Sequence, residues 1–97
     1  MPKSKIIVDE FINSLGNNFP IKLAYNSFNR SLFFFAVIDD NDHEAEKNII
    51  LTEARLNAKF SNQGYSVSAS IVGKDEEVEI PDYFKILAPQ FTSDENI

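Results

Sequence analysis

Residues 31–40 read SLFFFAVIDD, a run that is apolar on both of its alternating faces. One face carries Leu32, Phe34, Ala36 and Ile38, and the other carries Phe33, Phe35 and Val37. An unbroken apolar run of this length is typical of a strand that is covered on both sides. We therefore predict a central strand here. Its closing aspartates stand outside the carboxyl end of that strand, where α/β sheets often carry chemistry.

Two elements are predicted before this strand. Apolar residues recur at helical spacing over residues 4–15, and Gly16 follows as a C-cap. Residues 21–25 alternate between apolar and polar, as in a half-exposed strand. Residues 26–30 have the composition of a five-residue hairpin loop, so the short strand should pair antiparallel with the central one.

Two further elements are predicted after it. The longest helix should run from His43 to Gln63, with Asn41 or Asp42 as its N-cap and Gly64 as its stop signal. The next strand, residues 65–72, alternates apolar residues with serines, which indicates one covered and one polar face. A strand, a helix and a strand in succession predict a parallel pair.

The long helix carries two apolar arcs. The first consists of Ala45, Ile49, Leu56 and Phe60 and should cover the sheet. The second consists of Ile50, Leu51, Ala54 and Ala58. We interpret the second arc as packing on the N-terminal helix. The alternative is a homodimer interface, in which the two alanines allow close approach.

The C-terminal part is expected to add a short acidic edge strand at residues 77–80 and a short helix from Pro81 to Ala88. The predicted fold class is α+β, or a small α/β fold. It consists of a single-layer mixed sheet of three or four strands covered by two main helices, in the order α-β-β-α-β(-β) with a short C-terminal helix. We expect one globular domain over residues 1–89 and a flexible polar tail over residues 90–97.

Composition narrows the class of protein. A chain of 97 residues with 43% hydrophobic and 12% aromatic residues is expected to form one folded domain. Cysteine is absent, which excludes disulfides, thiolate metal sites and a cysteine nucleophile. We expect a cytoplasmic protein, with neither a signal peptide nor a membrane span.

Fifteen acidic residues against nine basic ones give a net charge of −6, and the excess is clustered. The first cluster comprises Asp39, Asp40, Asp42, Glu44 and Glu46, and the second comprises Asp75, Glu76, Glu77, Glu79 and Asp82. Such surfaces repel phosphate backbones, so direct nucleic-acid binding is not expected. They attract basic proteins, although solvated loops and a helix start would have the same composition.

Motifs for metal binding or catalysis are few. Asp39, Asp40 and Asp42 are candidate ligands for a divalent cation, but a calcium-binding EF-hand loop would need a mid-loop glycine that is missing. His43 is the only histidine, so a zinc site of ordinary composition is excluded. No nucleophile elbow or phosphate loop is present. We therefore expect no cofactor and no enzymatic activity.

The order of these elements, with Y-N-S at 25–27 and the run from Ser31 to Asp40, resembles the minimal nucleotidyltransferase core. That family carries a glycine-serine pair after its first strand and a spaced pair of metal-binding aspartates on its second. Here Asn26 and Ser27 replace the first motif, and the second falls on residues 32–34, which are Leu-Phe-Phe. The resemblance therefore implies an inactive, shortened relative, and no catalytic residue is carried over.

The function expected from these patterns is that of a small acidic protein-binding module. It would be an inhibitor, antitoxin, immunity protein or nucleic-acid mimic that engages a basic partner. The expected partner-binding residues are Asp75, Glu76, Glu77, Glu79, Asp82 and Phe28. The alternatives are a ligand- or metal-binding domain that uses Asp39, Asp40 and Asp42, and a structural homodimer.

Overall fold

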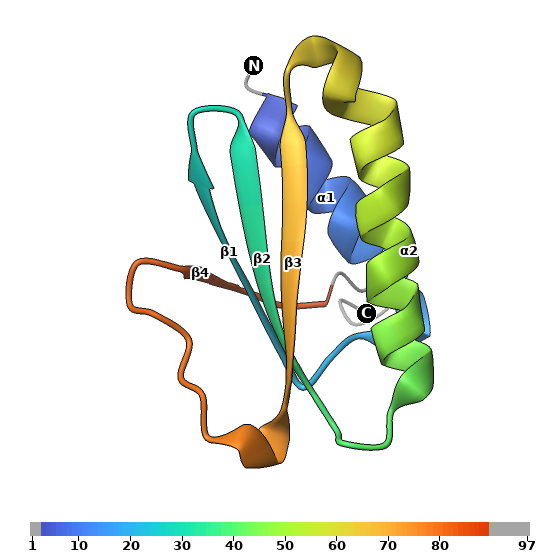
Figure 1. The fold of residues 1–97 in the computed structure, drawn as a ribbon, viewed down its shortest axis with the longest axis vertical. Helices are drawn as coiled ribbons and strands as arrows, with labels where there is room; N and C mark the ends of the chain where they lie inside the picture. Colours follow the sequence, from blue (N-terminus) through green and yellow to red (C-terminus); the bar gives the residue numbers. More distant parts are fainter. Residues whose placement is uncertain (1–2, 90–97) are drawn as a thin grey trace, which may run out of the picture.

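The computed structural model describes residues 3–89 and shows an α+β fold (Figure 1). Its helices and strands are α1 (Lys3–Leu15), β1 (Lys22–Phe28), β2 (Ser31–Ile38), α2 (His43–Phe60), β3 (Ser66–Gly73) and β4 (Lys85–Leu87). Single 3-10 turns follow α1, α2 and β3 at Gly16–Asn18, Ser61–Gln63 and Lys74–Glu76. The predicted order α-β-β-α-β-β is confirmed. The predicted tail at 90–97 lies outside the described residues.

The four strands form one mixed sheet in the order β3-β2-β1-β4. β2 pairs antiparallel with β1, from Lys22 opposite Val37 to Phe28 opposite Ser31. It pairs parallel with β3, from Ser31 opposite Ser66 to Ile38 opposite Gly73. β2 therefore has a strand on both sides, and its predicted central position is confirmed.

Both helices pack on one face of this sheet, which we call the inner face. Every inner-face residue of β2 is buried: Leu32, Phe34, Ala36 and Ile38. The rings of Phe11 in α1 and Phe34 in β2 stack with their centroids 3.8 Å apart. Ile49 and Leu56 of α2 complete this core. The hydrophobic core thus lies between β2 and the two helices.

The opposite face of the sheet, which we call the open face, has no helix over it. It carries Lys22, Ala24, Asn26 and Phe28 of β1, Phe33, Phe35 and Val37 of β2, and Ser66, Ser68 and Ser70 of β3. The prediction that β2 is buried on both faces is therefore wrong. Phe33 is 40% exposed, and Phe35 and Val37 are half-buried. They are not fully covered because both helices pack on the inner face.

The β1–β2 hairpin is tighter than predicted. Its strands run on to Phe28 and Ser31, so the connection is only Asn29 and Arg30. Asn29 adopts a positive φ of 57°, a conformation that asparagine tolerates better than most residues. This lets the turn form without glycine. The expected five-residue loop is therefore replaced by a two-residue turn.

The C-terminal predictions need two corrections. Residues 77–80 form no strand, and the helix expected over Pro81–Ala88 is absent. A turn closed by a bond from Phe84 N–H to the Pro81 carbonyl oxygen (3.0 Å) leads instead into β4. β4 pairs antiparallel with residues 23–25 of β1. Pairing with the unpaired edge of β1 satisfies backbone groups that a short, isolated helix would leave to water.

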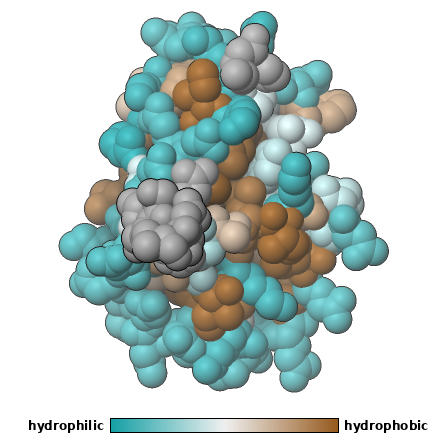
Figure 2. Space-filling view, turned by 180° about the vertical axis from the view of Figure 1, so that it is seen from behind, coloured by the Kyte–Doolittle hydropathy of each residue, from teal (hydrophilic) through white to brown (hydrophobic). Residues whose placement is uncertain are grey.

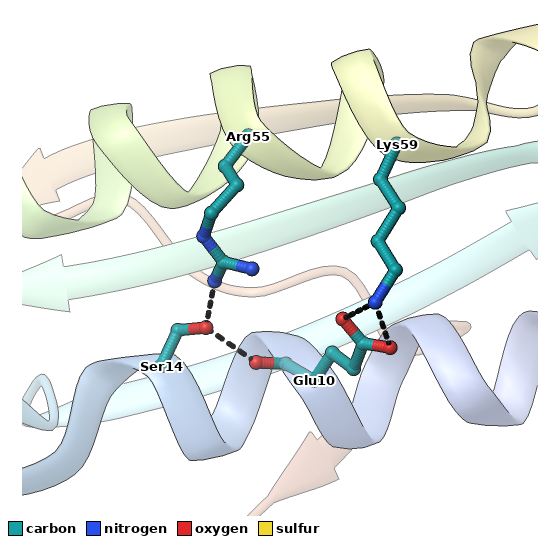
Figure 3. A network of polar contacts seen from close by, with 4 residues as sticks. All are labelled: Glu10, Ser14, Arg55 and Lys59. Carbon is teal, nitrogen blue, oxygen red and sulfur yellow. Dashed lines mark hydrogen bonds and ion pairs between the residues drawn. The ribbon is translucent and has the colours of Figure 1, made fainter.

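The second arc of α2 is exposed to solvent. Ile50 and Leu51 are 49% and 56% exposed, and Ala54 and Ala58 are also exposed, so the interpretation that this arc packs on α1 is wrong. Polar side chains also join the two helices beside the shared hydrophobic core (Figure 3). Lys59 Nζ lies 2.9 Å from Glu10 Oε2, and Arg55 donates to the Ser14 hydroxyl.

Side chains of α2 also bond to the outer backbone of the edge strand β3. Asn57 accepts from Val67 N–H and donates to the Val67 carbonyl oxygen, both at 2.8 Å. Glu53 accepts from Ala69 N–H at 3.1 Å. An edge strand whose free backbone groups are occupied in this way is protected from pairing with another chain.

The one-sided core predicts that Phe34 contributes much more to the free energy of unfolding than its neighbour Phe33. Replacing Phe34 by Ala should lower the free energy of unfolding by about 3–5 kcal/mol, because a fully buried ring and its stack on Phe11 are lost. Phe33→Ala, on the open face, should cost about 1 kcal/mol. Urea denaturation of both variants measures the difference. Equal losses would contradict the one-sided core.

Candidate functional site

The parallel pairing of β2 and β3 brings the two acidic clusters to the same end of the sheet. Ile38 lies opposite Gly73, so the residues that follow each strand become neighbours. Lys74 Nζ forms an ion pair with Asp39 Oδ1 at 3.0 Å, and both side chains are more than half exposed. The two acidic clusters are separate in the sequence but lie together in the structure. They form one surface, which we call the acidic end.

Asp40 and Asp75 interact directly across this junction. A hydrogen bond with the side chain of Asp75 raises the pKa of the Asp40 carboxyl, and slight desolvation and the charge of Asp75 raise it further. The Asp40 carboxylate lies where a side chain on Gly73 would begin, so glycine is needed for this approach. The hydrogen bond with Asp39 and its negative charge raise the pKa of Lys74.

The three aspartates proposed as metal ligands have different roles in the structure. Asp42 is the N-cap of α2, and its Oδ1 accepts from Ala45 N–H at 3.1 Å. Asp39 pairs with Lys74, and Asp40 interacts with Asp75. Within residues 3–89, no group of three or more His, Cys, Asp or Glu side chains is placed to hold a metal ion.

An apolar hollow lies beside the acidic end. It has a volume of about 640 Å³ and is lined by Ile21, Lys22, Val37, Lys74, Val78, Glu79, Ile80 and Ile86. Three of these apolar side chains are strongly exposed: Ile21 (51%), Val78 (46%) and Ile86 (62%). We call this hollow the strand-end hollow. Seen from behind, the molecule shows hydrophobic patches, in brown, between hydrophilic residues (Figure 2).

The segment between β3 and β4 returns over the open face. Figure 1 shows it as an orange loop on the side of the strands away from α2. The ring of Phe84 meets that of Phe35 edge to face, with centroids 6.0 Å apart. Tyr83 and Phe84 line a second, smaller hollow together with Phe33, Ser68 and Ser70. The loop thus contributes side chains to both hollows.

Most of the predicted partner-binding residues lie at or near the acidic end. Asp75, Glu76, Glu77, Glu79 and Asp82 are exposed in the segment after β3. Glu76 also accepts from Gly73 N–H at 3.0 Å, which fixes the turn. Phe28 is 70% exposed, but it closes β1 beside the hairpin turn, at the opposite end of β2. The structure therefore does not place Phe28 with the acidic residues.

Sequence reasoning missed the apolar lining of both hollows. The sequence predicts a helix over Pro81–Ala88, which contains Tyr83 and Phe84, and an edge strand over residues 77–80, which contains Val78 and Ile80. One signal could have revealed the open face: the alternating serines of β3 lie beside the phenylalanines of β2, with Ser68 opposite Phe33 and Ser70 opposite Phe35. A face of mixed hydroxyl and aromatic groups needs no covering helix.

Comparisons of the chain with protein-family models, curated proteins and solved structures find no significant match. The fold and the surface define a small α+β domain with one covered and one open sheet face. Within the described part of the chain, neither helix has the length and apolar character needed to cross a membrane.

The Asp40–Asp75 contact predicts a specific pH dependence. Because the folded state raises the Asp40 pKa above its ordinary 3.8, the stability it contributes is fully present below pH 3.8 and is lost as pH rises through the higher pKa. Carboxyl carbon NMR should show Asp40 titrating above 3.8 in the wild type. In Asp75→Ala its pKa should fall toward 3.8, whereas Glu79→Gln should change it little. An unchanged Asp40 titration in Asp75→Ala would contradict the pairing.

Proposed function

We propose that this protein is a small binding module that engages a basic protein partner through the acidic end and the strand-end hollow. One observation carries the proposal: parallel pairing of β2 with β3 gathers the two acidic clusters at one end of the sheet, next to exposed apolar side chains. The proposed compartment is the cytoplasm, in keeping with the absence of cysteine.

The composition of this surface supports a protein partner. Protein interfaces combine an apolar centre with a charged, solvated rim. Here Ile21, Val78 and Ile86 supply exposed apolar area, and Glu79 and Lys74 lie among them. The surrounding carboxylates would steer a positively charged protein and orient it before contact. Such a surface, apolar at its centre and acidic around it, suits an inhibitor, antitoxin or immunity protein that covers a basic, phosphate-binding cleft.

The proposal predicts a local effect of charge on association. Asp75→Asn with Glu79→Gln should lower the association rate of the partner that co-purifies with the chain, by about tenfold at low salt. It should also flatten the dependence of that rate on ionic strength. Glu76 is left unchanged because it holds the turn after β3. Stopped-flow or surface-binding kinetics at several salt concentrations measure both quantities.

A matched control separates local charge from net charge. Asn62→Lys with Gln63→Lys changes the net charge by the same amount, but at exposed positions just before β3 begins, at the other end of that strand. This control should keep most of the association rate. If both double variants behave alike, or if neither changes the rate, the acidic end is not the docking surface.

A second candidate function, a homodimer, rests on the exposed arc of α2. Ile50, Leu51, Ala54 and Ala58 remain on the surface after both helices have packed. Two copies could bury these arcs against each other along a twofold axis, where small residues allow close helix approach.

Mass measurement in solution tests the homodimer. The wild type should show a rising average mass with concentration in analytical ultracentrifugation, and Leu51→Glu should abolish the rise. Ile86→Glu, which adds the same charge at a residue that is 62% exposed outside the arc, should leave it intact. A monomer at every concentration would eliminate this candidate.

A further inference from the structure

A second hollow on the open face, between β2, β3 and the loop after β3, has features of a small-molecule site. Its volume is about 280 Å³. Its lining includes Asn26, Phe33, Ser68, Ser70, Tyr83 and Phe84. Four of these six belong to strands, which hold their side chains in fixed relative positions. We call it the aromatic hollow, and its role does not depend on the function proposed above.

The aromatic hollow presents rings that lack a covering layer. Phe33 is 40% exposed and Tyr83 is 70% exposed. The rings of Tyr83 and Phe84 are tilted by 44° with centroids 5.2 Å apart, and Phe84 is supported by Phe35 beneath the loop. Aromatic rings in such a setting favour a flat partner ring, either stacked or edge to face.

Three polar side chains in the same hollow have free hydrogen-bonding capacity. Within residues 3–89, no hydrogen bond joins the side chains of Asn26, Ser68 or Ser70 to another residue. Ser66, two residues earlier on the same face, does have a partner, since its hydroxyl donates to Ser31 Oγ at 3.1 Å. An amide and two hydroxyls supply both donors and acceptors.

The size and charge of the hollow suit a small uncharged ligand. Its volume of about 280 Å³ is enough for one flat ring system with polar substituents. The lining contains no charged side chain. Phosphorylated ligands are disfavoured further by the net charge of −6.

We infer that the aromatic hollow binds an uncharged, planar heteroaromatic molecule whose edge carries both hydrogen-bond donors and acceptors, as a nucleobase does. The ring stacks on Phe33 and Phe84. Its polar edge bonds to the Asn26 amide and to the hydroxyls of Ser68 and Ser70. This class of ligand uses the apolar walls and the unpaired polar groups together.

Amide NMR titration of the whole protein with adenosine, and separately with cytidine, tests the inference. At least one of them should cause saturable shifts centred on Asn26, Ser68 and Ser70. The corresponding monophosphates should bind more weakly. N-acetyltyrosinamide serves as a probe for the rival occupant, an aromatic side chain of a protein partner.

Two variants and one control make the test specific. Phe33→Leu keeps an apolar side chain but removes the stacking ring, and Ser68→Ala removes one hydroxyl. Together they should weaken nucleoside binding about tenfold. Ser66→Ala, on the same strand and face but outside the hollow, should leave affinity unchanged. The absence of saturable shifts in the wild type, equal losses in Ser66→Ala and Ser68→Ala, or binding of N-acetyltyrosinamide alone would overturn the inference.

Discussion

The burial of one face of β2 under both helices is the constraint on which the rest of the structure depends. Phe34 stacks on Phe11 of α1, and its neighbours on that face are also removed from water. Because successive strand residues point to opposite sides, a register error of one residue would exchange this face for the other. The same arrangement leaves Phe33 with no helix above it, so the open face is a direct consequence of where the helices pack.

Parallel pairing of β2 with β3 has two effects on the surface. It makes β3 an edge strand, whose outer backbone is occupied by Asn57 and Glu53 of α2. It also aligns the carboxyl ends of the two strands, so that Asp40 meets Asp75. The positive charge of Lys74 nearby offsets part of the repulsion between the two carboxyl groups.

Local patterns predicted α1, β2, α2 and β3 because each has a clear period and recognisable end signals, such as Gly64 after the long helix. The region after β3 lacked such a signal. Pro81 and the aromatic residues after it suit a helix start, but backbone pairing with β1 outweighed that local preference. The arc of Ile50 and Leu51 stays exposed. α1 and α2 meet in the shared core and through polar pairs such as Lys59–Glu10, and hydrophobic periodicity does not report the polar pairs.

The sequence by itself determined the order of the elements through β3, the central position of β2, the N-cap of α2 to within Asn41 or Asp42, and the existence of two acidic clusters. These features follow from the spacing and chemistry of residues that are close together in the sequence. Only the tertiary structure decided that both helices share one face, that the two acidic clusters become one surface, and that Asn26, Phe33 and Ser68 line one hollow with Tyr83. These juxtapositions depend on strand register and on contacts between residues distant in sequence, which no local pattern encodes.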